Sequence, residues 1–197
     1  MAEQKVMAYL EHNDYITNRI AEEMGVKRHI LSTMAKRNEI IREKPGVYGL
    51  PNEVMDEFYL IQVHSEKLIY SHLTALYFHG FTDRTPNVIH ITVPQGYNTK
   101  HLTKHYGYLI FHYVDASVFD LGVVTMKSPL GNDIVVYDKE RAICDIVKDQ
   151  KNQDRALFSE ALNRYFRSTE KDLRKLIKYS KALKIEEKVR QFAEVLQ

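Results

Sequence analysis

The chain contains little cysteine, few glycines and no long apolar run. Its one cysteine, Cys144, excludes an internal disulfide and any zinc site built from several cysteines. The glycines are scattered and form no phosphate-binding loop. No apolar run approaches the ~20 residues that a membrane span needs, and the N-terminal segment has no signal-peptide core. We therefore expect a cytoplasmic protein that does not associate with membranes.

The charged residues are distributed unevenly along the 197 residues. A composition of 44% hydrophobic and 27% charged residues is ordinary for a globular protein, and the net charge is only +2. Counting Lys and Arg against Asp and Glu, residues 1–26 carry −3, residues 27–50 carry +4, residues 51–150 carry −4 and residues 151–197 carry +5. Two basic blocks favour a polyanionic partner, and a solvated basic face is the alternative.

The first fifty residues have the pattern of three short helices. Apolar residues recur at helical spacing within residues 2–12, and Asp14 and Tyr15 are expected to turn the chain. Thr17 is a suitable N-cap for a second helix that ends before Gly25. Gly25 can adopt the left-handed conformation that a tight helix–helix turn requires. A third helix is therefore predicted over residues 26–37.

The third predicted helix has an apolar face and a polar, cationic face. At about 100° per residue, one half carries the apolar residues, namely Val26, Ile30, Leu31, Met34 and Ala35. The other half has no carboxylate and carries cationic and hydrogen-bonding residues, namely Arg28, His29, Ser32, Thr33 and Lys36. This face suits DNA, because base edges need donors and acceptors whereas phosphates repel carboxylates. Lys27 and Arg37, at the helix ends, are assigned to phosphates.

A β-hairpin is predicted directly after the third helix. Residues 39–43 and 46–50 read as short strands, and Pro45-Gly46 supplies the turn chemistry. A hairpin in this position is the wing of a winged helix-turn-helix, where Arg42 and Lys44 would contact backbone or minor groove. The predicted DNA contacts of this domain, residues 1–51, are Thr17, Lys27, Arg28, His29, Ser32, Thr33, Lys36, Arg37, Arg42 and Lys44. A winged-helix module that docks onto protein is the alternative.

Residues 52–197 are predicted to form a larger α+β domain that ends in a helical segment. Strands are expected at 88–93, 108–114, 123–127 and 134–137, the last two joined by a turn at 130–133. Helices are expected at 52–62, 71–80, 138–148, 154–167, 169–183 and 186–196. Ser71 and Asp138 are the expected N-caps of two of them, and Thr169 with Asp172 resembles a capping box.

One face of the predicted helix 169–183 is basic. The face carries Lys171, Arg174, Lys175 and Lys178, opposite an apolar face. These four residues are either a solvated helix face or a second surface for nucleic acid or a partner.

No catalytic or metal constellation assembles from the sequence. His101 and His105 have the spacing of a helical metal pair, but Lys100 and Lys104 beside them oppose a cation. His72 and His79 are interpreted as structural, and Cys144 as a small buried residue of an amphipathic helix. The acidic residues near the strands, Asp120, Asp133, Asp138 and Glu140, lack the acid-x-Lys order of a metal-dependent nuclease. We therefore expect no enzyme activity, no metal and no cofactor, and nuclease activity is a minor alternative.

Two segments resemble the abortive-infection AbiEi antitoxins. They are Ser71-His-Leu-Thr-Ala-Leu-Tyr-Phe-His-Gly-Phe-Thr-Asp83 and Val136-Tyr-Asp-Lys-Glu-Arg-Ala-Ile-Cys-Asp-Ile146. Ile91-Thr-Val-Pro-Gln-Gly-Tyr97 and the N-terminal winged helix also fit, so the similarity covers nearly the whole chain. Both long segments have structural interpretations as well, with Ser71 and Asp138 as helix caps and Arg141 paired with Asp145 at i, i+4.

The resemblance implies an antitoxin of a type IV toxin–antitoxin system that also represses its own operon. In that family the winged helix binds inverted repeats in the promoter, and the C-terminal domain counteracts a nucleotidyltransferase-like toxin without a stable complex. The sequence shows no heptads and no large exposed apolar stripe for dimerisation. We therefore expect a monomer in solution that binds two half-sites of the promoter cooperatively.

Overall fold

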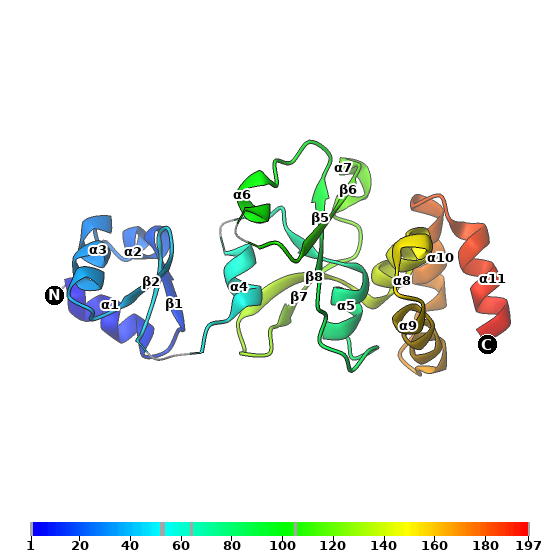
Figure 1. The fold of residues 1–197 in the computed structure, drawn as a ribbon, viewed down its shortest axis with the longest axis horizontal. Helices are drawn as coiled ribbons and strands as arrows, with labels where there is room; N and C mark the ends of the chain where they lie inside the picture. The colour runs from blue at the N-terminus through cyan, green and yellow to red at the C-terminus, as the bar shows by residue number, and fades with distance from the viewer. Residues whose placement is uncertain (1, 52–53, 64, 105, 197) are drawn as a thin grey trace. The chain divides into compact units, whose positions relative to one another are not determined.

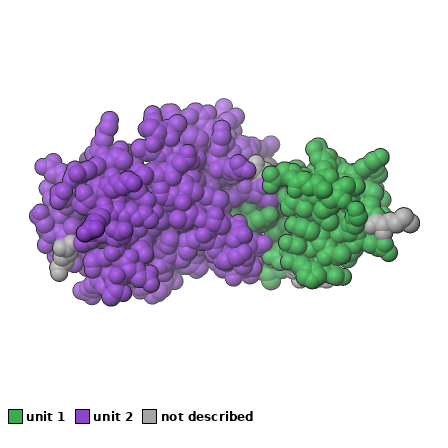
Figure 2. Space-filling model, turned by 180° about the vertical axis from the view of Figure 1, so that it is seen from behind, with its two compact units in different colours: residues 1–60 green, residues 61–197 purple. Residues whose placement is uncertain are grey.

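The computed structural model describes residues 2–51, 54–63, 65–104 and 106–196. The chain divides into two compact units, unit 1 with residues 1–60 and unit 2 with residues 61–197, coloured separately in Figure 2. The predicted α+β class is confirmed: unit 1 combines helices with a small antiparallel sheet, and unit 2 combines a mixed sheet with C-terminal helices (Figure 1). No described helix combines the length and the apolar composition needed to cross a bilayer.

Unit 1 packs three helices on a three-stranded sheet. The helices are α1 (Ala2–Leu10), α2 (Asn18–Glu23) and α3 (Arg28–Lys36), and the strands are β1 (Tyr15–Thr17), β2 (Ile41–Lys44) and β3 (Val47–Gly49). The sheet order is β1-β3-β2, with both pairings antiparallel. One apolar cluster joins these elements: Val6, Leu10, Ile16, Ala21, Val26, Leu31, Met34, Ile40 and Tyr48. Burial of this cluster is what orients α3.

The N-cap of α2 and the turn between α2 and α3 are as predicted. Thr17 is the N-cap of α2, and its side chain accepts a hydrogen bond from the Ile20 amide. Gly25, between α2 and α3, has a φ of 76°, a conformation that glycine adopts without steric cost. The Val26 amide donates to the Ala21 carbonyl at 2.8 Å, which closes the turn.

The prediction of a turn at Asp14 and Tyr15 was wrong at Tyr15. Tyr15 begins β1, which pairs with β3 through Tyr15 opposite Gly49 and Thr17 opposite Val47. A three-residue strand is too short to show an alternating pattern, so only the pairing partner defines it. Lys44 also lies in a strand, at the end of β2, and the hairpin turn consists of Pro45 and Gly46 alone.

Unit 2 is built on a mixed five-stranded sheet in the order β6-β5-β4-β8-β7. The strands are β4 (Ile69–Tyr70), β5 (Ile89–Pro94), β6 (Leu109–Val114), β7 (Val123–Lys127) and β8 (Asp133–Tyr137). The pairs β5–β6 and β4–β8 are parallel, whereas β4–β5 and β7–β8 are antiparallel. The inner strands are the most buried, because both of their faces are covered: β4 and the first five residues of β5 are buried, whereas β6 and β7 at the edges are largely exposed or half-buried.

The helices of unit 2 pack on this sheet and on one another (Figure 1). They are α4 (Glu57–Gln62), which begins in unit 1, α5 (His72–Phe78), α6 (Lys100–Thr103), α7 (Ala116–Phe119), α8 (Lys139–Lys148), α9 (Arg155–Arg167), α10 (Leu173–Ala182) and α11 (Glu186–Leu196), with a 3₁₀ turn η1 (Gln150–Asn152). Helix α5 contacts β5 and α8, and α8 also contacts α9, α10 and α11. Helix α8 is therefore the centre of the C-terminal part.

Two predicted helices begin later than expected. Of the helix predicted at 52–62, residues 52–53 lie outside the described residues, and α4 begins only at Glu57, where Asp56 accepts a hydrogen bond from the Tyr59 amide. Helix α10 begins at Leu173, because Asp172 is itself the N-cap and accepts from the Lys175 amide at 2.9 Å. The Thr169–Asp172 capping box was therefore a wrong prediction. Strand β4, helices α6 and α7 and the turn η1 were not predicted.

Candidate functional site

The exposed face of α3 presents the residues predicted to contact DNA. Leu31 and Met34 are fully buried, and Ile30 and Ala35 pack against the same core. All five residues of the opposite half are exposed, namely Arg28, His29, Ser32, Thr33 and Lys36. The amphipathic division of α3 is therefore the predicted one, with Lys27 as its exposed N-cap residue and Arg37 as its exposed C-cap residue.

The two hydroxyls of α3 point their hydrogens back at the helix. Ser32 Oγ donates to the His29 carbonyl at 2.9 Å, and Thr33 Oγ1 donates to the same carbonyl at 2.8 Å. A hydroxyl that donates its only hydrogen still offers lone pairs. In this state Ser32 and Thr33 are acceptors, which suits the amino groups that adenine and cytosine present in the major groove.

Carboxylates from neighbouring elements reach both ends of α3. Arg28 forms a two-bond pair with Glu22 of α2, at 2.5 Å for Nε–Oε1 and 3.1 Å for Nη2–Oε2. The same hydrogen bond lowers the pKa of Glu22. Arg37 pairs with Glu3 and with Glu39, the latter at 3.3 Å. Exposed pairs of this kind contribute only about 0–1 kcal/mol, so a phosphate can displace them.

Two of the predicted contacts are occupied within the fold. The Thr17 hydroxyl caps α2, and only 8% of the residue is exposed. Lys44 Nζ donates to the Leu60 carbonyl at 2.7 Å, and burial lowers the pKa of Lys44 to about 8. Both residues are therefore less accessible to a phosphate than the exposed residues of α3. Arg42 on β2 is exposed and is the wing cation that faces solvent.

The predicted basic face of residues 171–178 divides into two pairs. Lys171 precedes α10, and its Nζ donates to the Ser168 carbonyl at 3.2 Å. Lys175 Nζ lies 2.8 Å from Asp138 Oδ2. Only Arg174 and Lys178 are exposed. The four cations are separated for two reasons. Helix α10 begins only after Lys171, and Lys175 pairs with Asp138 at the start of α8.

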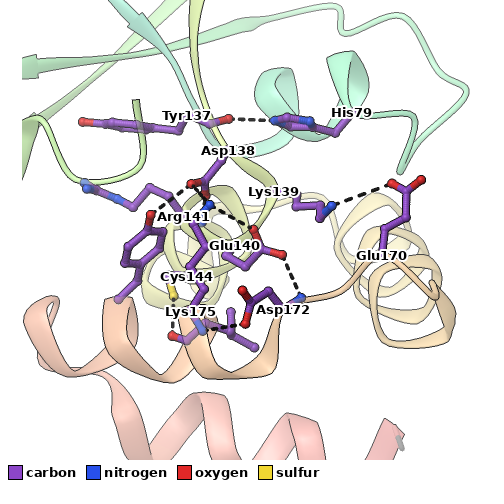
Figure 3. A network of polar contacts seen from close by, with 12 residues as sticks. His79, Tyr137, Asp138, Lys139, Glu140, Arg141, Cys144, Glu170, Asp172 and Lys175 are labelled. Atoms are coloured by element: carbon purple, nitrogen blue, oxygen red, sulfur yellow. Dashed lines mark hydrogen bonds and ion pairs between the residues drawn. The ribbon is translucent and has the colours of Figure 1, made fainter. Parts of the chain in front are cut away.

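The two segments that carry the family resemblance meet in the fold (Figure 3). His79, which ends α5, bonds through Nε2 to the Tyr137 carbonyl at 2.9 Å. Asp138 is the N-cap of α8, as predicted, and accepts from the Arg141 amide at 2.8 Å. Its other oxygen accepts from the Tyr179 hydroxyl at 3.0 Å and pairs with Lys175. Asp138 therefore links the start of α8 to α10.

Helix α8 also carries a buried ion pair. Arg141 Nε donates to Asp145 Oδ1 at 3.0 Å, which confirms the predicted i, i+4 pair. Arg141 Nη1 donates to the Val118 and Leu121 carbonyls, and its guanidinium lies 4.2 Å from the centre of the Tyr137 ring. Burial raises the pKa of Asp145 to about 6, so the carboxylate is still ionised at pH 7. Cys144 beside it is buried, as predicted, and burial raises the pKa of its thiol.

Of the four acidic side chains considered for a nuclease, Asp138 and Glu140 meet at the Lys175 ammonium, and no three of the four gather within the described residues. Asp133 pairs with Lys127 across the β7–β8 hairpin, and Glu140 accepts from the Asp172 amide. Three potential metal ligands do gather elsewhere among the described residues, namely His72, His90 and His112. Of the predicted His101–His105 pair, His105 lies outside the described residues. Sequence reasoning missed the three-histidine cluster, because its members come from three separate elements.

The fold of the chain is similar to that of a solved structure. No family model and no curated protein matches the sequence. The crystal structure of the RV2827C protein from Mycobacterium tuberculosis matches with a TM-score of 0.64 at 12% sequence identity. The match covers 98% of this chain and 76% of that chain. The two proteins share a fold. At 12% identity the similarity concerns the fold and does not extend to activity.

Proposed function

We propose that the chain is a DNA-binding transcriptional regulator that inserts α3 into the major groove. The observation that carries this proposal is the exposed half of α3, which holds cations and hydroxyls and is directed outward by a fully apolar inner half. A winged helix presents its recognition helix in this way, and the adjacent hairpin reaches the backbone beside it.

Each exposed residue that we propose to contact DNA has a role that follows from its chemistry. Arg28 and Lys36 are donors suited to guanine O6 and N7, whereas Ser32 and Thr33 accept from base amino groups. His29 lies between them. Lys27, Arg37 and Arg42 bind phosphates, which positions the protein without selecting a sequence. Two copies bind an inverted repeat, and the free protein is a monomer.

The finer proposal is that this regulator is the antitoxin of a type IV toxin–antitoxin pair and represses its own operon. Support comes from the two AbiEi-like segments, which lie together through His79 and Tyr137. In this proposal unit 2 counteracts a nucleotidyltransferase-like toxin without a stable complex and without catalysis. The larger unit thus carries the antitoxic activity, and unit 1 carries the regulation.

The test of DNA binding is the affinity of the full chain for a fragment of its own promoter, measured by fluorescence anisotropy. Arg28→Ala with Lys36→Ala should weaken binding by at least about 30-fold, since each of the two base contacts contributes about 1–3 kcal/mol and about 1.4 kcal/mol corresponds to a factor of ten. Lys188→Ala with Arg190→Ala removes the same charge from exposed positions of α11 and should leave the affinity within about twofold. Equal affinities for the two double variants would refute the assignment of α3.

A third double variant examines the remaining exposed pair of the basic face in unit 2. Arg174→Ala with Lys178→Ala should leave the salt dependence of DNA binding unchanged, because half of the predicted face is bound within the fold. A reduced salt slope would instead place this surface on phosphate.

The antitoxin proposal is tested by co-expression with the product of the adjacent gene. The wild-type chain should rescue growth, and the Arg28→Ala with Lys36→Ala variant should rescue it equally when expressed from an unrelated promoter. Loss of rescue only in that variant would favour the alternative, in which unit 1 docks onto the toxin. No rescue by the wild type would refute the antitoxin proposal and leave the DNA-binding proposal standing.

A further inference from the structure

Three histidines from separate elements of unit 2 gather their ring nitrogens in one place. His72 is the first residue of α5, His90 lies on β5, and His112 lies on the adjacent strand β6. His90 Nδ1 and His112 Nε2 are 2.9 Å apart, and the His72 and His112 rings stack with centroids 3.6 Å apart. One ligand atom from each of the three residues lies within 4.8 Å of the other two.

We propose that His72, His90 and His112 form a binding site for a divalent transition metal ion, with zinc as the ion that three imidazoles suit best. Zinc is bound by histidine nitrogens at about 2.0–2.1 Å, and sites with three protein ligands hold water in the fourth position. Tetrahedral geometry at those bond lengths puts two ligand nitrogens about 3.3 Å apart. The His90–His112 contact needs to open only slightly. The His72 ring, which stacks on His112, needs to turn so that one of its nitrogens faces the ion.

The chemistry of the three rings matches what a metal ligand requires. Burial lowers the pKa of His90 to about 4 and lowers the pKa of His72 and His112 as well. The imidazoles are therefore neutral at pH 7, which is the form that binds metals. The hydrogen bond between His90 Nδ1 and His112 Nε2 uses one N–H. When an ion takes its place, that hydrogen moves to the other nitrogen of the same ring, and both imidazoles stay neutral. The negative charge of Asp149 offsets part of this lowering of the pKa at His90 and His112, whereas the positive charges of Arg141 and Lys148 add to it at His72.

The surroundings hold the rings and leave one polar group unsatisfied. Ser71 Oγ lies 2.9 Å from His72 Nδ1 and orients that ring, as hydrogen bonds behind metal ligands do. Thr92 lies two residues after His90 on the same face of β5 and opposite His112 in the strand register. It is completely buried, and its hydroxyl has no hydrogen-bond partner among the described residues. A water molecule carried by the ion would supply that partner, which relieves an appreciable desolvation cost.

The backbone at His72 is consistent with a site that the fold maintains. His72 has a φ of 52°, in the left-handed region that is strained for a residue with a side chain. Strained positions of this kind cluster at ligand sites. His112 is only half-buried, so an ion can enter from the β6 side. A bound ion would fasten the start of α5 to β5 and β6.

The test uses the tag-free full chain after treatment with a chelator. Titration with Zn²⁺ should show one ion per chain, and Co²⁺ should give the visible absorption of a four-coordinate ion with nitrogen ligands. His112→Ala should weaken Zn²⁺ binding by at least about 100-fold, because losing only a residue behind the ligands costs about 10- to 100-fold. Ser71→Ala should weaken it by about 10-fold.

His101→Ala is the matched control, because it removes an exposed histidine of the same unit and should leave Zn²⁺ binding unchanged. Circular dichroism of each metal-free variant verifies the fold, and His112→Gln replaces His112→Ala if the latter fails to fold. Zn²⁺ should raise the melting temperature of the wild type and of His101→Ala but not of the His112 variant. Absence of a stoichiometric site in the wild type, or equal affinity in the His112 variant, would overturn the proposal.

Discussion

The two units of the chain differ in the depth of their ion pairs, because unit 2 has a buried pair in addition to exposed pairs such as Lys127–Asp133. Unit 1 keeps its ion pairs exposed, as in Arg28–Glu22 and Arg19–Glu23. Unit 2 buries Arg141 and Asp145 almost completely, together with His72 and His90. An exposed pair can exchange partners at a small cost in free energy, whereas breaking a buried pair destabilises the fold. The difference suggests that unit 1 meets a large charged partner at its surface, and that the polar groups of unit 2 organise its own interior.

The largest expected effect comes from breaking the buried pair. Asp145→Ala should lower the free energy of unfolding by about 3–5 kcal/mol, because it leaves the Arg141 guanidinium buried without its carboxylate. Glu23→Ala in unit 1 breaks an exposed i, i+4 pair and should cost less than about 0.5 kcal/mol. Urea denaturation of the two variants measures the contrast. Costs of similar size would mean that the two units do not differ in this respect.

The next effect is a pH dependence that belongs to unit 2. The folded protein holds the pKa of His90 near 4, whereas the unfolded chain has the ordinary value of 6.5. Between these values the unfolded state binds more protons, so His90 destabilises the fold as the pH falls from 6.5 to 4. The loss is about 1.4 kcal/mol per pH unit for one proton, about 3 kcal/mol in total.

His90→Gln should remove this contribution. The measurement is the slope of the free energy of unfolding against pH, compared with that of the wild type, both in the presence of a chelator. Asp145 acts with the opposite sign, because its raised pKa makes the folded state bind a proton first on acidification. The contribution of Asp145 cancels in the comparison, because Asp145 is present in both proteins. His101→Gln should retain the wild-type slope, and a His90→Gln slope equal to the wild type would show that His90 is not neutral in the fold.

A glycine in each unit provides a smaller contrast. Gly122 has a φ of 85°, and an added Cβ would lie 2.8 Å from Arg141 Cβ. Gly46 in the hairpin turn has a φ of 76°, but its added Cβ would meet the flexible end of Asn18. Both alanine variants incur left-handed strain of about 1–2 kcal/mol. Gly122→Ala should cost about 1–3 kcal/mol more, because a Cβ near the α8 backbone cannot move aside. Melting temperatures test this, and equal costs would contradict it.

The smallest expected effect concerns the exposed carboxylate beside α3. Glu22→Gln should raise the affinity for promoter DNA by about two- to fivefold, because it releases Arg28 and removes a negative charge near the phosphates. The free energy of unfolding of this variant should change little, because the Glu22–Arg28 pair is exposed. Glu23→Gln, on the same helix but paired with Arg19, should leave the affinity unchanged. An unchanged affinity for Glu22→Gln would place Arg28 away from the DNA.

The long elements were predictable from the sequence, and the short ones were not. Strand β7 and helix α11 have the predicted bounds, because five or more residues with a clear period outweigh local exceptions. Strands β1 and β4 have three and two residues, which carry no period of their own. The start of α10 was missed because both Thr169 and Asp172 are good caps, and only the contact between Asp172 and Glu140 decides between them.

By itself, the sequence determined which residues of α3 face outward and that Arg141 pairs with Asp145, because both follow from the period of a single helix. Only the tertiary structure decided that Glu22 reaches Arg28, that Lys44 and Lys175 turn inward, and that three histidines meet. Those contacts join residues from different elements. Their distances depend on how strands pair and how helices pack, and a local pattern of side chains does not specify either.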